Sequence, residues 1–372
     1  MRRGPAVAAV CLSLSLALVA CAPGGESAPS AERAGRESSL DTGRETAPEP
    51  RVVLPFEPVE VLSREPWEFG PHRGVAERTR RYRVFTTLAP GRARDRLAPF
   101  MERALGTYTR ELGPLPQPTV LLDVYVLRDR EQWARMTRQE LREDAGPYLA
   151  ILRGGFSWRG RAFLYDLGAD DTLRLAAHEG WHQYTQTAFK EPLPVWLEEG
   201  IASWMEGHRV GADGRVSFVP WGNVERHAEL ARLARAGERF SVRELLDQTP
   251  QELLVDQAGS DASALGYYAR AWALTAWLIS EPDGTTSTRR AKLRELLADA
   301  AGGRMSARVN ERLGVESNVF RNRRGPWVFR AYLEEDLDAA DRSFAAFVAA
   351  ITAEGSGERV RAGLPPVSAT RP

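Results

Sequence analysis

Residues 172–188 have the sequence TLRLAAHEGWHQYTQTA, in which two histidines stand four positions apart. Three polar side chains suited to a helix N-cap stand at its start: Asp170 and Asp171 just before the stretch, and Thr172 as its first residue. Small and apolar side chains then recur at helical spacing and would form a face suited to close packing; they are Leu173, Ala176, Ala177 and Gly180. Pro192 and Pro194 follow the stretch. The pattern therefore predicts a buried helix that ends near Ala188, with both histidines on one face.

The segments on either side of this helix differ in pattern. Before it, strong β-formers and amphipathic stretches predict strands at 82–87, 120–127 and 162–166, and helices at 94–112 and from about residue 131. After it, helical patterns dominate, with predicted helices at 195–207, 262–279 and 337–352. We therefore expect an α+β fold, in which a small α/β module with a short sheet and an edge strand (78–170) precedes a mostly helical domain (171–354).

The two ends of the chain have compositions typical of unfolded segments. Residues 21–77 are rich in Pro, Gly, Ser, Glu and Arg and predict a disordered tether, and residues 355–372 predict a flexible tail. The chain as a whole is 43% hydrophobic, which is enough for a buried core. Its 50 basic and 50 acidic side chains balance, so the net charge gives no indication of a nucleic-acid partner.

The first 20 residues predict an export signal. Two arginines precede an apolar run at 6–20, which is too short to span a bilayer comfortably. The run ends in Leu18-Val19-Ala20-Cys21, which resembles the bacterial lipobox. The resemblance implies cleavage before Cys21, acylation of its sulfur and attachment to a membrane. Ala22 in the next position favours the periplasmic face of the outer membrane or the cell surface. The alternative is an ordinary signal peptide with a chance cysteine.

The spacing of His178 and His182 suits a metal site. Side chains four positions apart lie on one face of a helix, so both imidazoles could bind a single zinc ion at about 2.0–2.1 Å. Glu179 stands next to His178, where its carboxylate cannot join the pair as a ligand but could take a proton from water beside the metal. The alternative is a helix with two histidines of no special role. The chain has only five histidines, however, so a chance H-E-x-x-H is rare.

A second motif follows at 194–206, with the sequence PVWLEEGIASWME. Taken with the H-E-G-W-H motif at 178–182, its W-L-E-E-G-I-A run resembles the gluzincin branch of the peptidase MA clan. The resemblance implies a zincin-like helical domain that holds one zinc ion between His178, His182 and Glu199. It also implies an acidic residue at Glu206, which we expect to support a ligand imidazole rather than to bind the metal. Glu198 is the competing ligand, but adjacent helical residues point about 100° apart, so only one of the two can face the metal.

The match to the known branches of this clan is partial. Ser203 stands where the thermolysin pattern has an aspartate, and the third histidine of the metzincins is missing. The G-x-M-E-N signature, which anchors a substrate amine in the aminopeptidases, is also absent, so exopeptidase activity is not implied. In layout the chain is most similar to less characterised exported bacterial proteins with a peptidase-MA-like pattern.

Two further features fit such a site. Zinc peptidases need a hydrogen-bond donor for the oxyanion, and Tyr268 resembles the tyrosine of a downstream helix in these proteins. The alternative is that Tyr268 packs in a helical core and that His208 or His227 is the donor. The stretch 154–166 precedes the motif helix, and it is either the edge strand that pairs with a substrate backbone or an ordinary sheet edge.

These features predict a membrane-anchored zinc metallopeptidase that acts on a peptide or protein, with Glu179 as the catalytic base and Tyr268 as the oxyanion donor. One alternative is a zinc hydrolase of another amide, such as a cell-wall peptide. Another is a non-catalytic zinc-binding lipoprotein that binds a partner. A purely structural site, however, has no need of Glu179 and usually closes its fourth position with a protein ligand.

Overall fold

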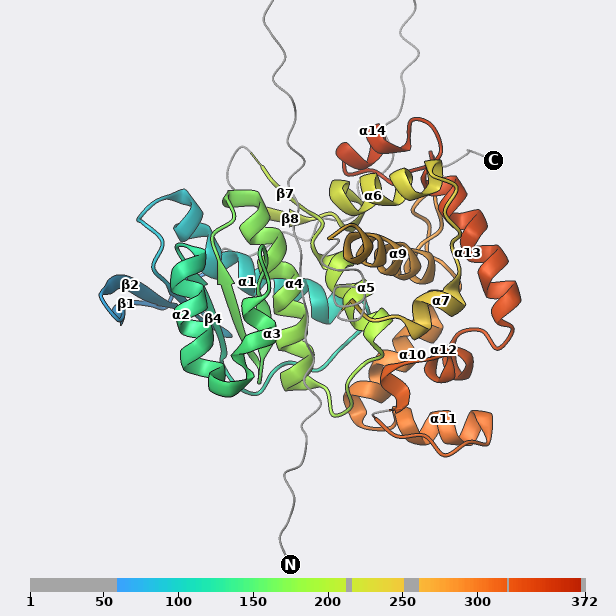
Figure 1. Ribbon diagram of the computed structural model, residues 1–372, viewed down its shortest axis with the longest axis horizontal. Helices are drawn as coiled ribbons and strands as arrows, with labels where there is room; N and C mark the ends of the chain where they lie inside the picture. The colour runs from blue at the N-terminus through green and yellow to red at the C-terminus, as the bar shows by residue number, and fades with distance from the viewer. Residues whose placement is uncertain (1–58, 212–215, 251–260, 320, 369–372) are drawn as a thin grey trace, which may run out of the picture.

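The computed structural model describes residues 59–368, apart from 212–215, 251–260 and residue 320. The predicted signal sequence, Cys21 and most of the predicted tether lie outside the described residues. Within the described residues, no helix is both long and apolar enough to cross a membrane. An N-terminal sheet is followed by a mostly helical part, which confirms the predicted α+β fold (Figure 1).

A six-stranded mixed sheet forms the first half of the fold. Its strand order is β1-β2-β3-β4-β6-β5; β3, β4 and β6 run parallel, and the outer strands pair antiparallel. Since β5 comes last in this order, one of its sides has no strand partner in the described chain. The strands span Ser63–Phe69 (β1), His72–Arg78 (β2), Tyr82–Thr86 (β3), Leu122–Leu127 (β4), Phe156–Trp158 (β5) and Arg161–Tyr165 (β6).

The hairpin β1–β2 corrects the prediction that residues 21–77 form a tether. Many positions on its two strands are charged and exposed, so composition alone indicates disorder. The hairpin is nonetheless anchored to the sheet, because Val75 is buried and the Trp67 ring packs on the rings of Phe85 and Tyr125. The folded part therefore begins with β1 rather than near residue 78.

Helices cover both faces of the sheet because side chains alternate along each strand. On β6, Ala162 and Leu164 belong to the core that also contains α1 and α4, whereas Phe163 and Tyr165 belong to a second cluster with α2 and α3. These helices span Arg92–Glu111 (α1), Arg130–Leu141 (α2), Ala145–Leu149 (α3) and Ala169–Ala188 (α4).

The motif helix α4 begins earlier than its sequence pattern predicts. Gly168 is its N-cap residue and has a φ of 99°, a conformation that side chains with a Cβ rarely adopt. The predicted caps Asp170, Asp171 and Thr172 lie instead in the first turn. The two carboxylates are favourable there, because the N-terminal end of a helix carries partial positive charge.

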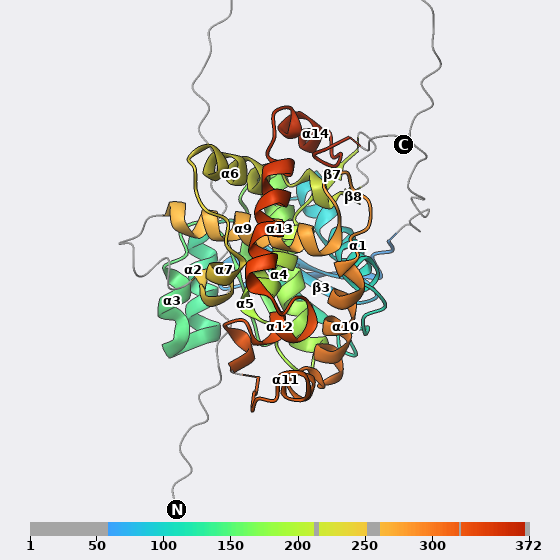
Figure 2. The same ribbon diagram turned by 90° about the vertical axis from the view of Figure 1, so that its right-hand side faces the viewer.

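Helix α9 (Asp261–Ile279) is central to the second half, where it contacts α5, α6, α7, α10 and α13. It crosses α5 very closely: a Cβ added to Gly200 would lie 2.3 Å from Thr275 Oγ1 and 2.6 Å from Ala271 O. Figure 2 shows α13 on the outside of α9. The other helices of this half span Val195–Met205 (α5), Val224–Arg235 (α6), Val242–Asp247 (α7), Arg289–Gly302 (α10), Met305–Leu313 (α11), Trp327–Tyr332 (α12), Leu337–Ile351 (α13) and Ser356–Arg361 (α14).

Two short elements depart from the predicted layout. The hairpin of β7 (His208–Val210) and β8 (Val216–Phe218) interrupts the second half of the chain, which the sequence pattern predicts as helical. Helix α14 lies within the predicted flexible tail; it packs on α6 and buries Val360. Because Val360 is the one apolar side chain that α14 buries, the helix shows no repeating pattern of apolar residues in the sequence. Single 3-10 turns lie at Arg142–Asp144, Pro220–Gly222 and Arg321–Arg323.

Candidate metal centre

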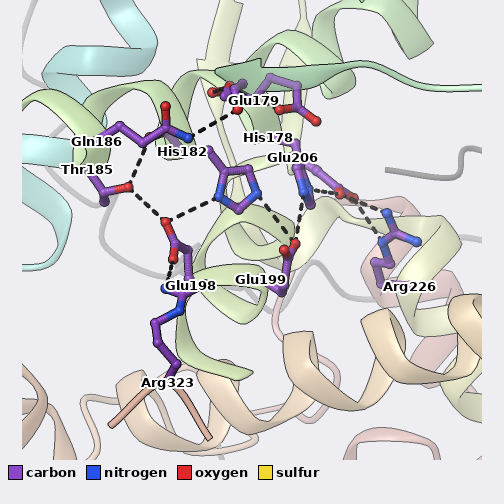
Figure 3. Close-up of polar contacts among 11 residues, drawn as sticks. His178, Glu179, His182, Thr185, Gln186, Glu198, Glu199, Glu206, Arg226 and Arg323 are labelled. Atoms are coloured by element: carbon purple, nitrogen blue, oxygen red, sulfur yellow. Dashed lines mark hydrogen bonds and ion pairs between the residues drawn. The ribbon is translucent and has the colours of Figure 1, made fainter. Parts of the chain in front are cut away.

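Two neighbouring helices bring three metal-binding side chains together. His178 and His182 lie one turn apart on α4, and Glu199 faces them from α5, which packs against α4. Glu199 Oε2 lies 3.3 Å from His178 Nε2 and 3.4 Å from His182 Nε2 (Figure 3). One donor atom from each residue lies within 4.8 Å of the others. This buried group could hold a metal ion, and of the two adjacent acids it includes Glu199 rather than Glu198.

The three donor atoms are buried without hydrogen bonds. His178 Nε2, His182 Nε2 and Glu199 Oε2 have no hydrogen-bond partner among the residues that the structure describes. Each buried polar atom without a partner costs about 1–3 kcal/mol, so such a cluster calls for a ligand. Two imidazole nitrogens and one carboxylate oxygen are a set that metal sites use. The chemistry of the donors therefore fits a metal ion.

The charges around the donors also favour a cation. Four carboxylates and two guanidinium groups surround them; the acids are Glu179, Glu198, Glu199 and Glu206, and the arginines are Arg226 and Arg323. When all four acids are ionised, the two arginines balance two of the four negative charges. A divalent cation would balance the remaining two. Burial opposes charging of the imidazoles, but the neighbouring carboxylates outweigh it and raise the pKa of both His178 and His182.

Glu206 holds the far side of the His178 ring. It follows α5 directly, and its Oε1 lies 2.8 Å from His178 Nδ1. Burial would raise the pKa of Glu206, but Arg226 and the hydrogen bond to His178 lower it to about 2. An ionised carboxylate can only accept, so His178 Nδ1 carries a proton, and in the neutral ring Nε2 then has its lone pair towards the metal group. The structure thus places Glu206 against the imidazole of His178, the residue that the sequence predicts as a metal ligand.

Glu198 has the matching place beside His182. Its Oε1 lies 3.5 Å from His182 Nδ1 and accepts from Thr185 Oγ1 at 3.0 Å, while its Oε2 lies 2.5 Å from Arg323 Nη1. Burial opposes ionisation, yet Arg323 and His182 lower the pKa of Glu198 to about 2. The sequence gives no signal for this role of Glu198 beyond its position, 100° around the helix from Glu199. It gives none for Arg323, which lies 125 positions further along the chain.

The edge strand β5 contacts the residue predicted as the catalytic base. Ser157 Oγ lies 2.7 Å from Glu179 O and 3.0 Å from Glu179 Oε2, and it can donate its one proton to either oxygen. Gly155 also lies near the Glu179 side chain, since a Cβ added to this glycine would be 3.5 Å from Glu179 Cγ. The stretch 154–166 therefore includes a sheet edge beside the candidate metal centre. Ser157 is a further site residue, and its sequence gives no sign of this contact.

Tyr268 reaches the same centre from α9. Its ring centroid lies 6.0 Å from that of His178, and its buried hydroxyl has no hydrogen-bond partner in the described part of the chain. Burial and the nearby Glu199 carboxylate raise the pKa of Tyr268 well above its usual value. The hydroxyl therefore keeps its proton and can donate it. Tyr267 packs edge-on against Tyr268, with ring centroids 5.9 Å apart.

The two other histidines weighed as donors are held elsewhere. His208 Nδ1 lies 3.0 Å from Glu206 O, and its ring packs on Phe100 at 5.3 Å. His227 Nε2 lies 2.8 Å from Ile351 O. Neither belongs to the metal-binding group of the described residues.

The arrangement has three chemical capacities. His178, His182 and Glu199 can hold one ion, Glu179 can accept a proton beside it, and Tyr268 can donate a hydrogen bond from the opposite helix. No family model matches the sequence, and no curated protein matches it.

Proposed function

We propose that this chain is a zinc metallopeptidase of the gluzincin type, which hydrolyses peptide bonds in a peptide or protein. The observation that carries the proposal is the buried donor set of His178, His182 and Glu199, whose facing atoms have no hydrogen bond within the described residues, with Glu179 next to His178. The donor set is one that catalytic zinc takes, and it uses three protein ligands, which leaves a fourth position for water or substrate. A base beside the metal is needed for hydrolysis and has no purpose in a structural site.

Each side chain has a definite task in this reaction. Zinc bound to the three ligands would polarise the scissile carbonyl and make a bound water more acidic. Glu179 accepts the proton from the attacking water and returns it to the leaving amine. The Ser157 hydroxyl keeps the Glu179 carboxylate in place, at 3.0 Å. Tyr268, whose hydroxyl is protonated and has no hydrogen-bond partner among the described residues, donates to the oxygen that gains negative charge.

The free side of β5 supports a peptide as the substrate. An extended peptide can add to a sheet edge through main-chain hydrogen bonds, which recognise any sequence. Since Ser157 of β5 contacts Glu179, a peptide on this edge would lie beside the candidate metal centre. Such binding would bring a scissile bond near His178 and His182.

The lipobox indicates where in the cell this activity would take place. We propose that the chain is an exported bacterial lipoprotein, held through a lipid on Cys21 at the periplasmic face of the outer membrane or at the cell surface. Membrane fractionation of cells that produce the wild type and Cys21→Ser tests this proposal. The wild type should sediment with membranes and the variant should be released; equal distribution would contradict the anchor.

The decisive experiment measures zinc and cleavage together. The full chain in detergent should bind about one zinc ion per molecule and cleave a peptide library. Glu179→Gln should retain the metal and lose cleavage, whereas the control Glu229→Gln, which alters a surface acid paired with Arg232, should retain both. A chain that binds zinc but cleaves only cell-wall peptides would be a different zinc hydrolase. Zinc without any cleavage would leave the partner-binding alternative, and no zinc at all would refute the metal centre.

A further inference from the structure

Arg226 is a charged side chain buried beside the candidate metal centre. It lies in the first turn of α6, which packs against α9, and only 5% of its surface is exposed. The helix start is fixed there, since Asn223 caps α6 by accepting from Arg226 N. Burying a guanidinium is costly unless its partners hold it closely. Its partners therefore indicate what it does.

The first partner is Glu206. Arg226 Nε donates to Glu206 Oε2 at 3.1 Å, and Arg226 Nη2 donates to Glu206 Oε1 at 2.8 Å. Two parallel bonds of this kind fix the plane of the carboxylate. The same Oε1 lies 2.8 Å from His178 Nδ1. Asn223 Nδ2 also donates to Glu206 Oε2, at 2.8 Å, but of the two only Arg226 bonds both oxygens, so Arg226 helps to set the orientation of the His178 ring through Glu206.

The second partner is Tyr268. Arg226 Cζ lies 5.0 Å from the centroid of the Tyr268 ring, which is within the range of a cation–π contact. That ring lies in turn 6.0 Å from the ring of His178. One guanidinium thus contacts both Glu206, which supports His178 on α4 (Figure 3), and Tyr268, the candidate oxyanion donor on α9.

We propose that Arg226 is a positioning residue of the metal centre: it holds Glu206 so that His178 presents Nε2 to the metal, and it holds the ring of Tyr268 against the site. The inference rests on the zinc site of the proposed function but does not require that the site cleave peptides. An ion pair that served only the fold would affect stability without affecting the metal. Loss of Arg226 should instead leave the Glu206 carboxylate held by Asn223 Nδ2, at 2.8 Å, without its two guanidinium bonds, and so loosen the ligand imidazole.

The test compares Arg226 with a matched arginine elsewhere. Arg312 also stacks on a tyrosine, with its Cζ 4.9 Å from the Tyr332 ring, and also pairs with an acid, Glu295, at 2.6 Å. Full-length Arg226→Met, Arg226→Lys and Arg312→Met are compared with the wild type. The affinity for zinc is measured by competition with a chromophoric chelator. The visible absorption spectrum of the cobalt-substituted protein reports the geometry of the ligands.

We expect Arg226→Met to weaken zinc binding about 10–100-fold and to change the cobalt spectrum. Arg226→Lys keeps the charge but lacks the planar guanidinium that makes two parallel bonds, so its loss of zinc affinity should be smaller and its cobalt spectrum still altered. Arg312→Met should match the wild type in both measurements. Wild-type affinity and spectrum in folded Arg226→Met would overturn the inference, and if that variant does not fold, the same result in Arg226→Lys would do so. A wild type that binds zinc without cleaving peptides would refute only the proposed peptidase.

Discussion

Replacing Gly200 by alanine tests whether the close crossing of α5 and α9 sets the position of Glu199, the proposed metal ligand. The added Cβ would lie 2.6 Å from Ala271 O, a main-chain atom that cannot rotate away. The helices must therefore separate by about 0.8 Å to restore an ordinary 3.4 Å contact. Overpacking of this kind costs about 1–3 kcal/mol, and the better helix propensity of alanine returns at most about 1 kcal/mol. We expect a net loss of up to about 2 kcal/mol in the free energy of unfolding.

The same displacement should weaken metal binding, because Glu199 immediately precedes Gly200. Metal–ligand distances tolerate only about ±0.2 Å, so we expect zinc affinity to fall at least about tenfold. Urea unfolding of the metal-free protein and chelator competition measure the two effects. Gly266→Ala is the control, since the nearest atoms to its Cβ would be Arg270 Nη1 at 3.4 Å and a Leu233 methyl at 3.6 Å. Wild-type stability and affinity in Gly200→Ala would refute the idea that this crossing positions the ligand.

Three other substitutions have distinct expected results. Ser157→Ala removes a hydrogen bond to the Glu179 carboxylate and should lower kcat about 10–150-fold, as a loss of about 1.5–3 kcal/mol does, with zinc affinity unchanged. An unchanged kcat would show that Ser157 does not position the Glu179 carboxylate. Tyr268→Phe should keep zinc and lower kcat about 10²–10³-fold, as loss of an oxyanion donor does. Steady-state kinetics on a cleaved peptide measure the effect, and equal kcat values for variant and wild type would mean that Tyr268 only packs. Burial lowers the pKa of His208 to about 4 in the folded protein. As the pH falls below about 6.5, this histidine therefore binds a proton in the unfolded chain before it does so in the folded one. The free energy of unfolding should consequently drop by about 3 kcal/mol by about pH 4. Urea unfolding at pH 7 and 4.5 should show a smaller drop for His208→Gln than for the wild type, and equal drops would mean that His208 is not buried in its neutral form.

Local geometry explains which parts of this site its sequence predicts. Four residues make slightly more than one helical turn, so His178 and His182 must share a face of α4 whatever surrounds them. Glu199 follows from the resemblance of a second motif on the next helix. The partners of these residues depend on tertiary packing instead. Arg226 and Arg323 stand in no motif, and nothing separates them in sequence from the many other arginines of the chain.

The limits of the folded part were harder to predict for a different reason. A short hairpin with one solvated face is rich in charged residues, and so is a disordered segment. What distinguishes the two is the packing of Trp67 on the rings of Phe85 and Tyr125, which belong to later strands. The start of α4 has a similar cause, because a glycine with positive φ replaces the polar caps that its pattern favours.

The groups around the metal-binding residues come from distant places along the chain, from Ser157 on β5 to Arg323 after α11. During synthesis both histidines therefore exist long before the arginine that secures Glu198. A chain still crossing a membrane, or cut short before residue 323, would carry the H-E-x-x-H motif without the surroundings that make it work. If the chain is the proposed protease, it would become active only after its own folding was nearly complete, which would protect the cell that makes it.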